Sequence, residues 1–265
     1  MHKMKRIIPF ILNLLPRPLL IRISYIFMRF GAVFYRGNNV ECPVCGGHFR
    51  KFLPYGYREV RHNALCPKCL SLERHRLLWL FLKEKTGFFT DKMKVLHIAP
   101  EQCFYIRFKK LNNLEYTTAD LESPLAEIKF DIQQIPLPDN IYDMVICNHV
   151  LEHVEDDHRA LREIFRILKP GGMAILQVPM IMDKEKTYED ATITKPEDRL
   201  KHFHQKDHHR IYGTDFPERV KQAGFEITET SFLDEIAPDI KKRYRLPEKE
   251  FMYGYKKPAT QIINH

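Results

Sequence analysis

The sequence predicts an α/β fold, in which helices flank an open and mostly parallel sheet, preceded by a small cysteine-based module. Two observations predict it. Residues 142–178 read as a strand, a helix and a second strand in succession. Two Cys-x-x-Cys pairs, at 42–45 and 66–69, lie ahead of that segment. We therefore expect a catalytic or binding domain of ordinary size that follows a much smaller metal-binding unit.

The strand–helix–strand segment is defined by its apolar spacing. Residues 142–147 are too few and too rich in β-branched side chains for a helix, so they predict a buried strand. Leu161, Ile164, Phe165 and Leu168 then follow at helical spacing, and residues 169–172, Lys-Pro-Gly-Gly, predict the end of that helix. A third apolar run, 173–178, predicts the next strand.

The strand–helix–strand arrangement predicts where a binding site lies. Ligands of open parallel sheets bind beside the carboxyl ends of the strands. Asp131, Asn148 and Val178 each end an apolar stretch. We therefore expect the active site to lie near these three residues.

Residues 131–154, DIQQIPLPDNIYDMVICNHVLEHV, and residues 167–179, ILKPGGMAILQVP, resemble the core of class I S-adenosylmethionine-dependent methyltransferases of the methyltransferase type 11 kind. The likeness extends over roughly residues 91 to 257. It implies a Rossmann-like sheet of seven strands and methyl transfer from S-adenosylmethionine. It also implies cofactor contacts, with Asp131 bonding the adenine, Ile132 packing on the adenine ring, and Asp120 holding the ribose diol. Leu121, Asn148 and His149 are further expected cofactor-binding residues.

The turn after the first strand departs from the family pattern. His97 stands where an acid is usual, and Ala99, Pro100 and Glu101 replace a glycine-rich turn. A dinucleotide needs backbone amides against its pyrophosphate, whereas S-adenosylmethionine carries no phosphate. The turn therefore argues against a nicotinamide cofactor. We expect these three turn residues to contact S-adenosylmethionine, with Glu101 supplying a negative charge near its ammonium or sulfonium group.

Four cysteines, Cys42, Cys45, Cys66 and Cys69, predict a structural zinc site. Each Cys-x-x-Cys turn can present two thiolates to a tetrahedral Zn²⁺. Disulfides or buried thiols are the alternative, and His48 and His62 are the alternative ligands. The other two cysteines, Cys103 and Cys147, lie in apolar surroundings and are expected to pack in the core.

Histidines near the expected acceptor side are the candidate catalytic residues. An oxygen acceptor can require a general base, and histidine suits that role at neutral pH. His149 and His153 follow the strand at 142–147, although His153 fits a structural role as well. Further along the chain, His208, Arg210 and Tyr212 are expected to shape the acceptor pocket, where the arginine and the tyrosine could bind an anionic group.

We divide the chain into a basic apolar arm at 1–40, a zinc-ribbon module at 41–70, a connecting helix at 71–90 and a methyltransferase domain at 91–265. The net charge of +8 belongs to the arm, since residues 1–40 hold seven Lys and Arg and no acid, which leaves the remainder at only +1. A nearly neutral body disfavours a wide phosphate-binding surface. In the connecting helix, Arg74 and Arg76 are expected either to lean over the cofactor or to face solvent.

The arm is cut by prolines before any apolar run is long enough to cross a bilayer, and no export cleavage pattern follows its cations. We therefore expect a cytoplasmic protein. Residues 1–38 either touch the inner face of the membrane peripherally or pack on a protein surface.

The sequence thus predicts S-adenosylmethionine-dependent methyl transfer to a small molecule or a glycan/lipid intermediate. An RNA methyltransferase of the ribosomal RNA type is one alternative, because some of those enzymes also carry a four-ligand zinc site ahead of this fold. A scaffold that has the cofactor fold but no catalytic activity is the other.

Overall fold

The structure, a computed structural model, describes residues 30–56, 60–229, 232–250 and 254–259. These residues form two compact units. The first runs to residue 80 and takes in 236–248, and the second comprises 81–235 with the segment after 248. This division differs from the predicted boundaries, because α3 (Glu73–Glu84) crosses from one unit to the other and a late segment joins the first unit.

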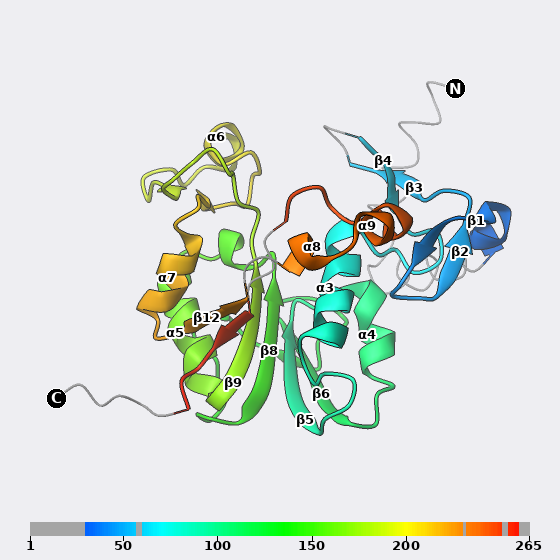
Figure 1. The fold of residues 1–265 in the computed structure, drawn as a ribbon. Helices are drawn as coiled ribbons and strands as arrows, with labels where there is room; N and C mark the ends of the chain where they lie inside the picture. Colours follow the sequence, from blue (N-terminus) through cyan, green and yellow to red (C-terminus); the bar gives the residue numbers. More distant parts are fainter. Residues whose placement is uncertain (1–29, 57–59, 230–231, 251–253, 260–265) are drawn as a thin grey trace. The chain divides into compact units, whose positions relative to one another are not determined.

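The second unit contains a seven-stranded sheet of order β12-β13-β9-β8-β5-β6-β7 (Figure 1). Strands β7, β6, β5, β8 and β9 pair in parallel, and β13 runs antiparallel to both β9 and β12. The predicted seven-stranded α/β architecture is confirmed. The strands are β5 (Met93–Ile98), β6 (Leu114–Asp120), β7 (Ile128–Lys129), β8 (Tyr142–Asn148), β9 (Leu168–Gln177), β12 (Glu226–Glu229) and β13 (Gly254–Lys256).

Helices and short turns connect these strands. A two-stranded ribbon, β10 (Tyr188–Glu189) with β11 (Arg210–Ile211), lies in the segment after β9. The helical elements of the second unit, besides the end of α3, are α4 (Gln102–Phe108), the 3₁₀ turn η2 (Leu151–His153), α5 (Asp157–Ile167), α6 (Pro196–His202), α7 (Phe216–Gln222) and α8 (Phe232–Glu235).

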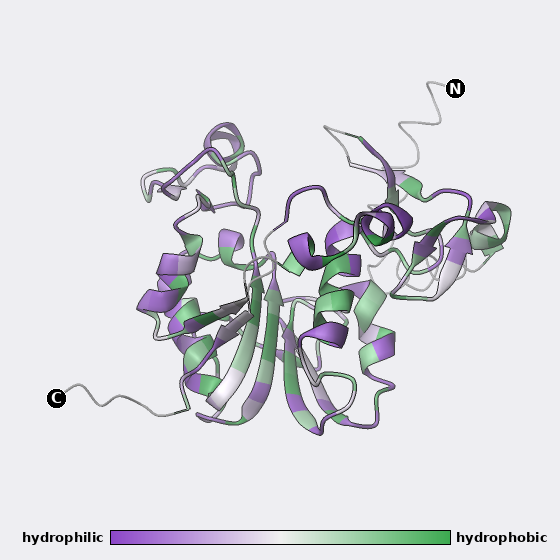
Figure 2. Cartoon of the chain, viewed as in Figure 1, coloured by the Kyte–Doolittle hydropathy of each residue, from purple (hydrophilic) through white to green (hydrophobic). Residues whose placement is uncertain are grey.

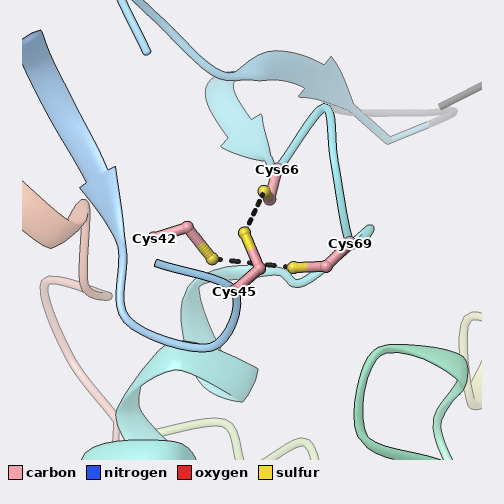
Figure 3. A group of neighbouring side chains, drawn as sticks. All are labelled: Cys42, Cys45, Cys66 and Cys69. Carbon is pink, nitrogen blue, oxygen red and sulfur yellow. Dashed lines mark hydrogen bonds between the residues drawn. The ribbon is translucent and has the colours of Figure 1, made fainter. Parts of the chain in front are cut away.

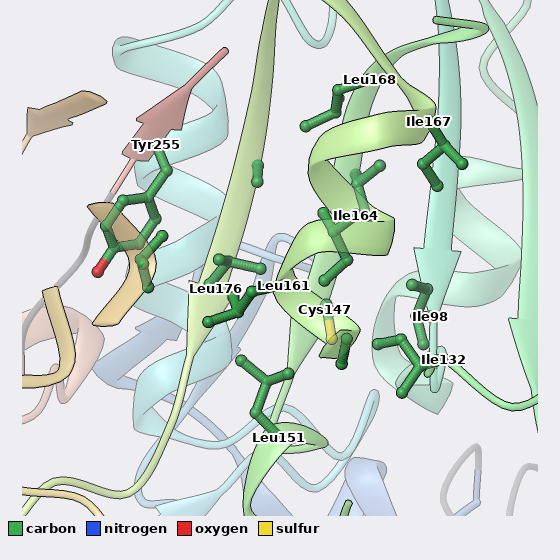
Figure 4. Close-up of a cluster of buried hydrophobic side chains, with 14 of the residues drawn as sticks. Ile98, Ile132, Cys147, Leu151, Leu161, Ile164, Ile167, Leu168, Leu176 and Tyr255 are labelled. Atoms are coloured by element: carbon green, nitrogen blue, oxygen red, sulfur yellow. The ribbon is translucent and has the colours of Figure 1, made fainter. Parts of the chain in front are cut away.

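One hydrophobic core fastens α5 and α7 to the sheet. Leu161, Ile164 and Ile167 of α5 are fully buried beside strand residues such as Cys147 and Leu176 (Figure 4). The central strands are correspondingly hydrophobic along most of their length (Figure 2). A fully buried side chain of this size contributes roughly 1.5–3 kcal/mol to folding, so this face of α5 holds the helix in place. The carboxyl ends of the strands are thereby fixed relative to one another.

One predicted boundary was wrong. Strand β9 begins at Leu168, five residues before the predicted start, because that residue already pairs with Tyr142. The Lys-Pro-Gly-Gly segment does end the helix, but it lies in the irregular first part of the strand, where Gly171 adopts a φ of +79°.

The described residues of the first unit form two β-hairpins and three helical segments. Its elements are η1 (Ala32–Tyr35), β1 (Arg36–Cys42) paired with β2 (Gly47–Phe49), β3 (Leu53–Tyr55) paired with β4 (Arg61–Leu65), the first part of α3, and α9 (Pro238–Tyr244). The first Cys-x-x-Cys turn connects β1 to β2, and the second follows directly after β4.

Arg76 connects the parts of the first unit, and neither of its predicted positions was right. Its side chain is fully buried and donates hydrogen bonds to the backbone carbonyls of Ala64, Ser71, Tyr244 and Arg245. Its guanidinium also lies 4.5 Å from the centre of the Phe52 ring. A buried guanidinium needs such acceptors, so Arg76 explains why the segment after α8 belongs to the small unit.

Among the helices that the structure describes, none combines the length and hydrophobicity needed to cross a bilayer. Most of the arm, residues 1–29, lies outside the described residues. Its predicted membrane contact therefore stays a prediction.

Candidate cofactor and metal sites

The carboxyl ends of β5, β8 and β9 bring polar side chains together. Asn148 ends β8 and pairs in register with Gln177, which ends β9. Both side chains are buried, at 4% and 3% exposure. Polar residues at the ends of adjacent parallel strands mark the ligand edge of such a sheet.

Glu101 is held at this edge by two neighbours. Its Oε2 lies 2.6 Å from Nε2 of His97, and its Oε1 accepts a hydrogen bond from Nδ2 of Asn148 at 3.1 Å. The carboxylate therefore bridges the ends of β5 and β8, with a side-chain exposure of 16%. The turn that lacks glycine thus delivers a fixed negative charge to the edge of the sheet.

His97 holds this carboxylate in place from the middle of a hydrogen-bonded chain of three side chains. Its ring is fully buried, and its Nδ1 lies 2.8 Å from the Tyr116 hydroxyl. Burial raises the pKa of Tyr116, so its hydroxyl stays protonated. An ionised Glu101 can only accept, so Nε2 of His97 donates the hydrogen bond to its carboxylate. The histidine that replaces the usual acid therefore positions another acid four residues later.

Two non-glycine residues beside this cluster adopt left-handed backbone conformations. Ala99 has a φ of +50° and His149 a φ of +54°. The Ala99 amide donates to the Ala119 carbonyl at 2.8 Å, and the His149 amide donates to the Gln177 carbonyl at 2.8 Å. A left-handed conformation costs roughly 1–2 kcal/mol for such residues and concentrates at functional sites. The turn after β5 thus keeps a left-handed geometry at Ala99 without a glycine there.

The two predicted carboxylates of the cofactor cleft lie on neighbouring segments. Asp120 ends β6, and its Oδ1 accepts from the amides of Glu122 and Ser123 at 2.8 and 2.7 Å. Asp131 is exposed and accepts from the amide and the side chain of Gln133. These bonds fix the orientation of each carboxylate.

Apolar neighbours complete that side of the edge. Ile132 is 5% exposed and belongs to the hydrophobic core, whereas Leu121 is 65% exposed. Pro100 is buried in the turn after β5. The structure therefore brings the predicted cofactor residues to one edge of the sheet, although Ile132 packs mainly against other core side chains.

The predicted catalytic histidines lie on and just before η2. Nδ1 of His149 is 3.4 Å from the Glu152 carboxylate, and Nδ1 of His153 is 3.2 Å from that of Asp207. His208 is 6% exposed, and its ring meets that of His153 edge-on with centroids 4.7 Å apart. The loop after α6 thus brings His208 against His153, one of the two predicted catalytic histidines.

Arg210 and Tyr212 are placed differently from His208. Arg210 is 3% exposed and donates to the carbonyls of Leu151, Val154 and Glu155, and to Glu189. The buried Tyr212 hydroxyl donates to Asp157 at 2.7 Å. Because their polar atoms are already engaged inside the protein, the structure disfavours their predicted contact with an acceptor. Arg210 instead holds η2, and Tyr212 holds the start of α5.

The four cysteines of the first unit meet in space (Figure 3). The Sγ atoms of Cys42 and Cys69 are 3.6 Å apart, and those of Cys45 and Cys66 are 3.8 Å apart. A tetrahedral zinc with Zn–S bonds of about 2.3 Å would separate its sulfurs by about 3.8 Å, whereas a disulfide needs about 2.05 Å. The spacing therefore fits one metal ion and not two disulfides.

The backbone of the two knuckles is nearly the same. Gly46 donates to the Cys42 carbonyl at 2.8 Å and Leu70 donates to the Cys66 carbonyl at 3.0 Å, each with a φ near +60°. The Ser71 hydroxyl lies 3.1 Å from the Cys42 sulfur and 3.3 Å from the Cys69 sulfur. The donor set and its surroundings fit the predicted zinc ribbon.

Two residues that belong to the polar cluster around Glu101 were not predicted. Gln177 is a polar residue near the end of an apolar run, and that pattern was the available signal in the sequence. In the structure it pairs in register with Asn148. Tyr116 had none, because its partnership with His97 depends on the pairing of β5 with β6.

Comparison with known proteins agrees with this geometry. Residues 95–176 match the family model described as a methyltransferase domain. The chain carries a methyltransferase domain. The match runs from β5 through β9, which are the strands that bring Glu101, Asn148 and Gln177 together.

Individual relatives of this methyltransferase domain cover shorter stretches. The chain is 29% identical over 108 residues to a probable S-adenosylmethionine-dependent methyltransferase of Mycolicibacterium smegmatis, which covers 40% of this chain and 38% of that protein. It is 41% identical over 49 residues to the ubiquinone/menaquinone biosynthesis C-methyltransferase UbiE of Pasteurella multocida, covering 18% of each. The chain thus spans well under half the length of these curated relatives.

Among solved structures, the [4+2]-cyclase SpnF is similar, with a TM-score of 0.51 and 17% identity over 82% of this chain and 91% of that one. This similarity shows the fold of the methyltransferase domain and no more.

Proposed function

We propose that this protein transfers a methyl group from S-adenosylmethionine to an acceptor. The carboxylate of Glu101 carries the proposal, because His97 and Asn148 hold it at the carboxyl edge of the sheet. S-adenosylmethionine supplies a methyl group activated by a sulfonium, and it is a cation at that centre and at its ammonium group. A negative charge that two neighbours hold in place, in a partly buried turn, favours such a cationic ligand.

Each neighbouring residue has a separate task in this proposal. Asp120 and Asp131, oriented by backbone amides, would bond the ribose and the adenine. Asn148 both holds Glu101 and presents a buried Oδ1 that has no partner among the described residues. The remaining requirement is to align the acceptor with the methyl group and to exclude water, which proximity and orientation can supply.

Replacing Glu101 with glutamine tests the proposal. We expect Glu101→Gln to bind S-adenosylmethionine at least tenfold more weakly, about 1.4 kcal/mol, because the amide keeps the shape but removes the charge. Isothermal calorimetry measures the dissociation constant. Glu115→Gln is the matched control, since Glu115 forms an ion pair with Lys94 at the opposite end of the sheet.

Equal affinity of Glu101→Gln and the parent protein would contradict the role of this carboxylate. If the parent protein bound neither S-adenosylmethionine nor S-adenosylhomocysteine, the alternative of a non-catalytic scaffold would replace the proposal. The fold likeness to a cyclase does not decide between these outcomes.

We propose a small molecule or a glycan/lipid intermediate as the acceptor, because the chain beyond residue 40 carries a charge of only +1. RNA remains the alternative acceptor. Steep salt dependence of RNA binding by the full chain would favour RNA, because neutralised phosphates release counterions. If the acceptor is a glycan/lipid intermediate, we propose that residues 1–38 contact an anionic membrane. Vesicle flotation of the protein with and without these residues tests that contact.

We further propose that Cys42, Cys45, Cys66 and Cys69 bind one structural Zn²⁺ with no open position. The sulfur spacing supports this, and the small first unit needs such a crosslink because it has few residues to form a core.

A further inference from the structure

We propose that Glu152, His153 and His208 form a second metal site, which binds a divalent transition metal ion beside the cofactor cleft. One ligand atom from each of these residues lies within 4.8 Å of the others. Two imidazole nitrogens and one carboxylate oxygen are a donor set for Zn²⁺, Fe²⁺ or Co²⁺. The site is separate from the four cysteines in sequence and in chemistry.

The carboxylate supplies the strongest argument. Glu152 is 2% exposed, and its Oε2 is a buried atom that has no hydrogen-bond partner among the described residues. Its Oε1 lies 3.4 Å from Nδ1 of His149, whose own Nε2 is also buried and has no such partner. Burying an ionised carboxylate oxygen without a partner is costly. A cation at Oε2 would remove that cost.

The histidines are positioned as metal ligands usually are. Nδ1 of His153 lies 3.2 Å from the Asp207 carboxylate, which leaves its Nε2 for a metal. A carboxylate behind a ligating histidine fixes the ring and makes it more basic. His208 is 6% exposed, so its ring is held by packing.

The loop that carries His208 is fastened to η2 by its next two residues. The His209 amide donates to the Glu152 carbonyl at 2.8 Å. Arg210 donates to the carbonyls of Leu151, Val154 and Glu155 at 2.8, 2.7 and 2.6 Å. The three ligands are therefore organised before any metal binds, as a functional metal site requires.

The location suggests what the metal would do. Glu152 and His153 follow Asn148 at the end of β8, so the metal would lie on the acceptor side of the cleft that we assign to S-adenosylmethionine. Three protein ligands leave at least one open position. This part of the inference rests on the proposed function, and it predicts an acceptor that presents a hydroxyl or carboxylate oxygen to the metal.

Titration with Co²⁺ tests the site in the full chain, with zinc left on the four cysteines. We expect one additional Co²⁺ per chain, bound with d–d absorption bands but without the charge-transfer band of a cobalt thiolate. Glu152→Gln and His208→Asn should each weaken binding at least tenfold. His204→Asn is the matched control, because His204 is exposed on the same loop and has a φ of +68°, which asparagine tolerates.

Folding of each variant is checked by circular dichroism, and His153→Gln serves as a second test because its side chain is 35% exposed and its loss should leave the fold intact. The inference is overturned if all the cobalt that the parent protein binds shows the thiolate charge-transfer band. It is also overturned if the folded variants bind cobalt as tightly as the parent protein does. Calorimetry with S-adenosylmethionine on the same samples separates the two proposals. Cofactor binding without cobalt binding rejects only the metal site, and cobalt binding without cofactor binding rejects only the methyl transfer.

Discussion

Cys66→Ser is expected to remove one zinc ion per chain and to unfold the first unit. A structural zinc site contributes its binding free energy to folding, on the order of 10–16 kcal/mol in small zinc modules. The first unit, with two short hairpins around the cysteines, should not stay folded without it. Metal analysis of the purified protein gives the zinc content, and a thermal unfolding scan should lose the transition of this unit.

Cys103→Ser is the control, because Cys103 lies in α4 of the other unit. It should leave the zinc content unchanged. A Cys66→Ser protein with its full zinc content would contradict the assignment of the zinc site. Disulfide bonds among the four cysteines of the parent protein, detected as resistance to thiol reagents, would also contradict it.

Asp157→Asn is expected to destabilise the second unit by about 3–5 kcal/mol. Asp157 is 1% exposed and accepts hydrogen bonds from Tyr212 at 2.7 Å and from Arg219 at 2.8 and 3.2 Å. Arg210, which is also buried, lies 3.8 Å away. Neutralising the carboxylate leaves two guanidinium groups with less negative charge nearby. Urea unfolding followed by circular dichroism measures the change in the free energy of unfolding.

Asp156→Asn provides a matched control one residue earlier. The Asp156 side chain caps α5 by accepting from the Arg159 amide at 2.8 Å. Asparagine is an equally good cap, so this change should alter stability by only a few tenths of a kcal/mol. Similar losses from both substitutions would contradict the special role of Asp157.

The same carboxylate predicts how stability depends on pH. Burial alone would raise the pKa of Asp157, but Arg219, Arg210 and Tyr212 outweigh it and hold that pKa below its ordinary value. The carboxylate therefore stabilises the fold above the unfolded pKa of about 3.9, and this contribution is lost as the pH falls through the lower folded pKa. We expect the stability difference between the parent protein and Asp157→Asn to shrink below about pH 4 in urea unfolding at stepped pH.

Much of the site was predictable because it depends on strand ends. Asn148 and Asp120 close β-branched stretches, and the carboxyl ends of parallel strands always meet at one edge. Glu101 was also predicted to supply the charge of the missing acid, and the structure places it at this edge, although its cofactor role stays a prediction. The hydrogen-bond partners of Glu101 could not be predicted. A local pattern shows that a residue follows a strand, but its partner can come from another strand, far away in the sequence.

Arg210 and Tyr212 show the opposite case. An arginine and a tyrosine in a histidine-rich insertion resemble a pocket for an anion. In the structure both are buried and bonded to η2 and α5. Nothing in the local sequence distinguishes an arginine that meets a ligand from one that meets three backbone carbonyls.

The sequence by itself determined the α/β class, the strand–helix–strand succession of β8, α5 and β9, and the two Cys-x-x-Cys pairs, because each depends on short-range spacing. Only the tertiary structure decided that Arg76 joins α9 to the small unit, that His97 holds Glu101, and that His208 lies beside Glu152. These depend on contacts between segments far apart in the chain. Such contacts form only when the whole core has packed, so no local pattern encodes them.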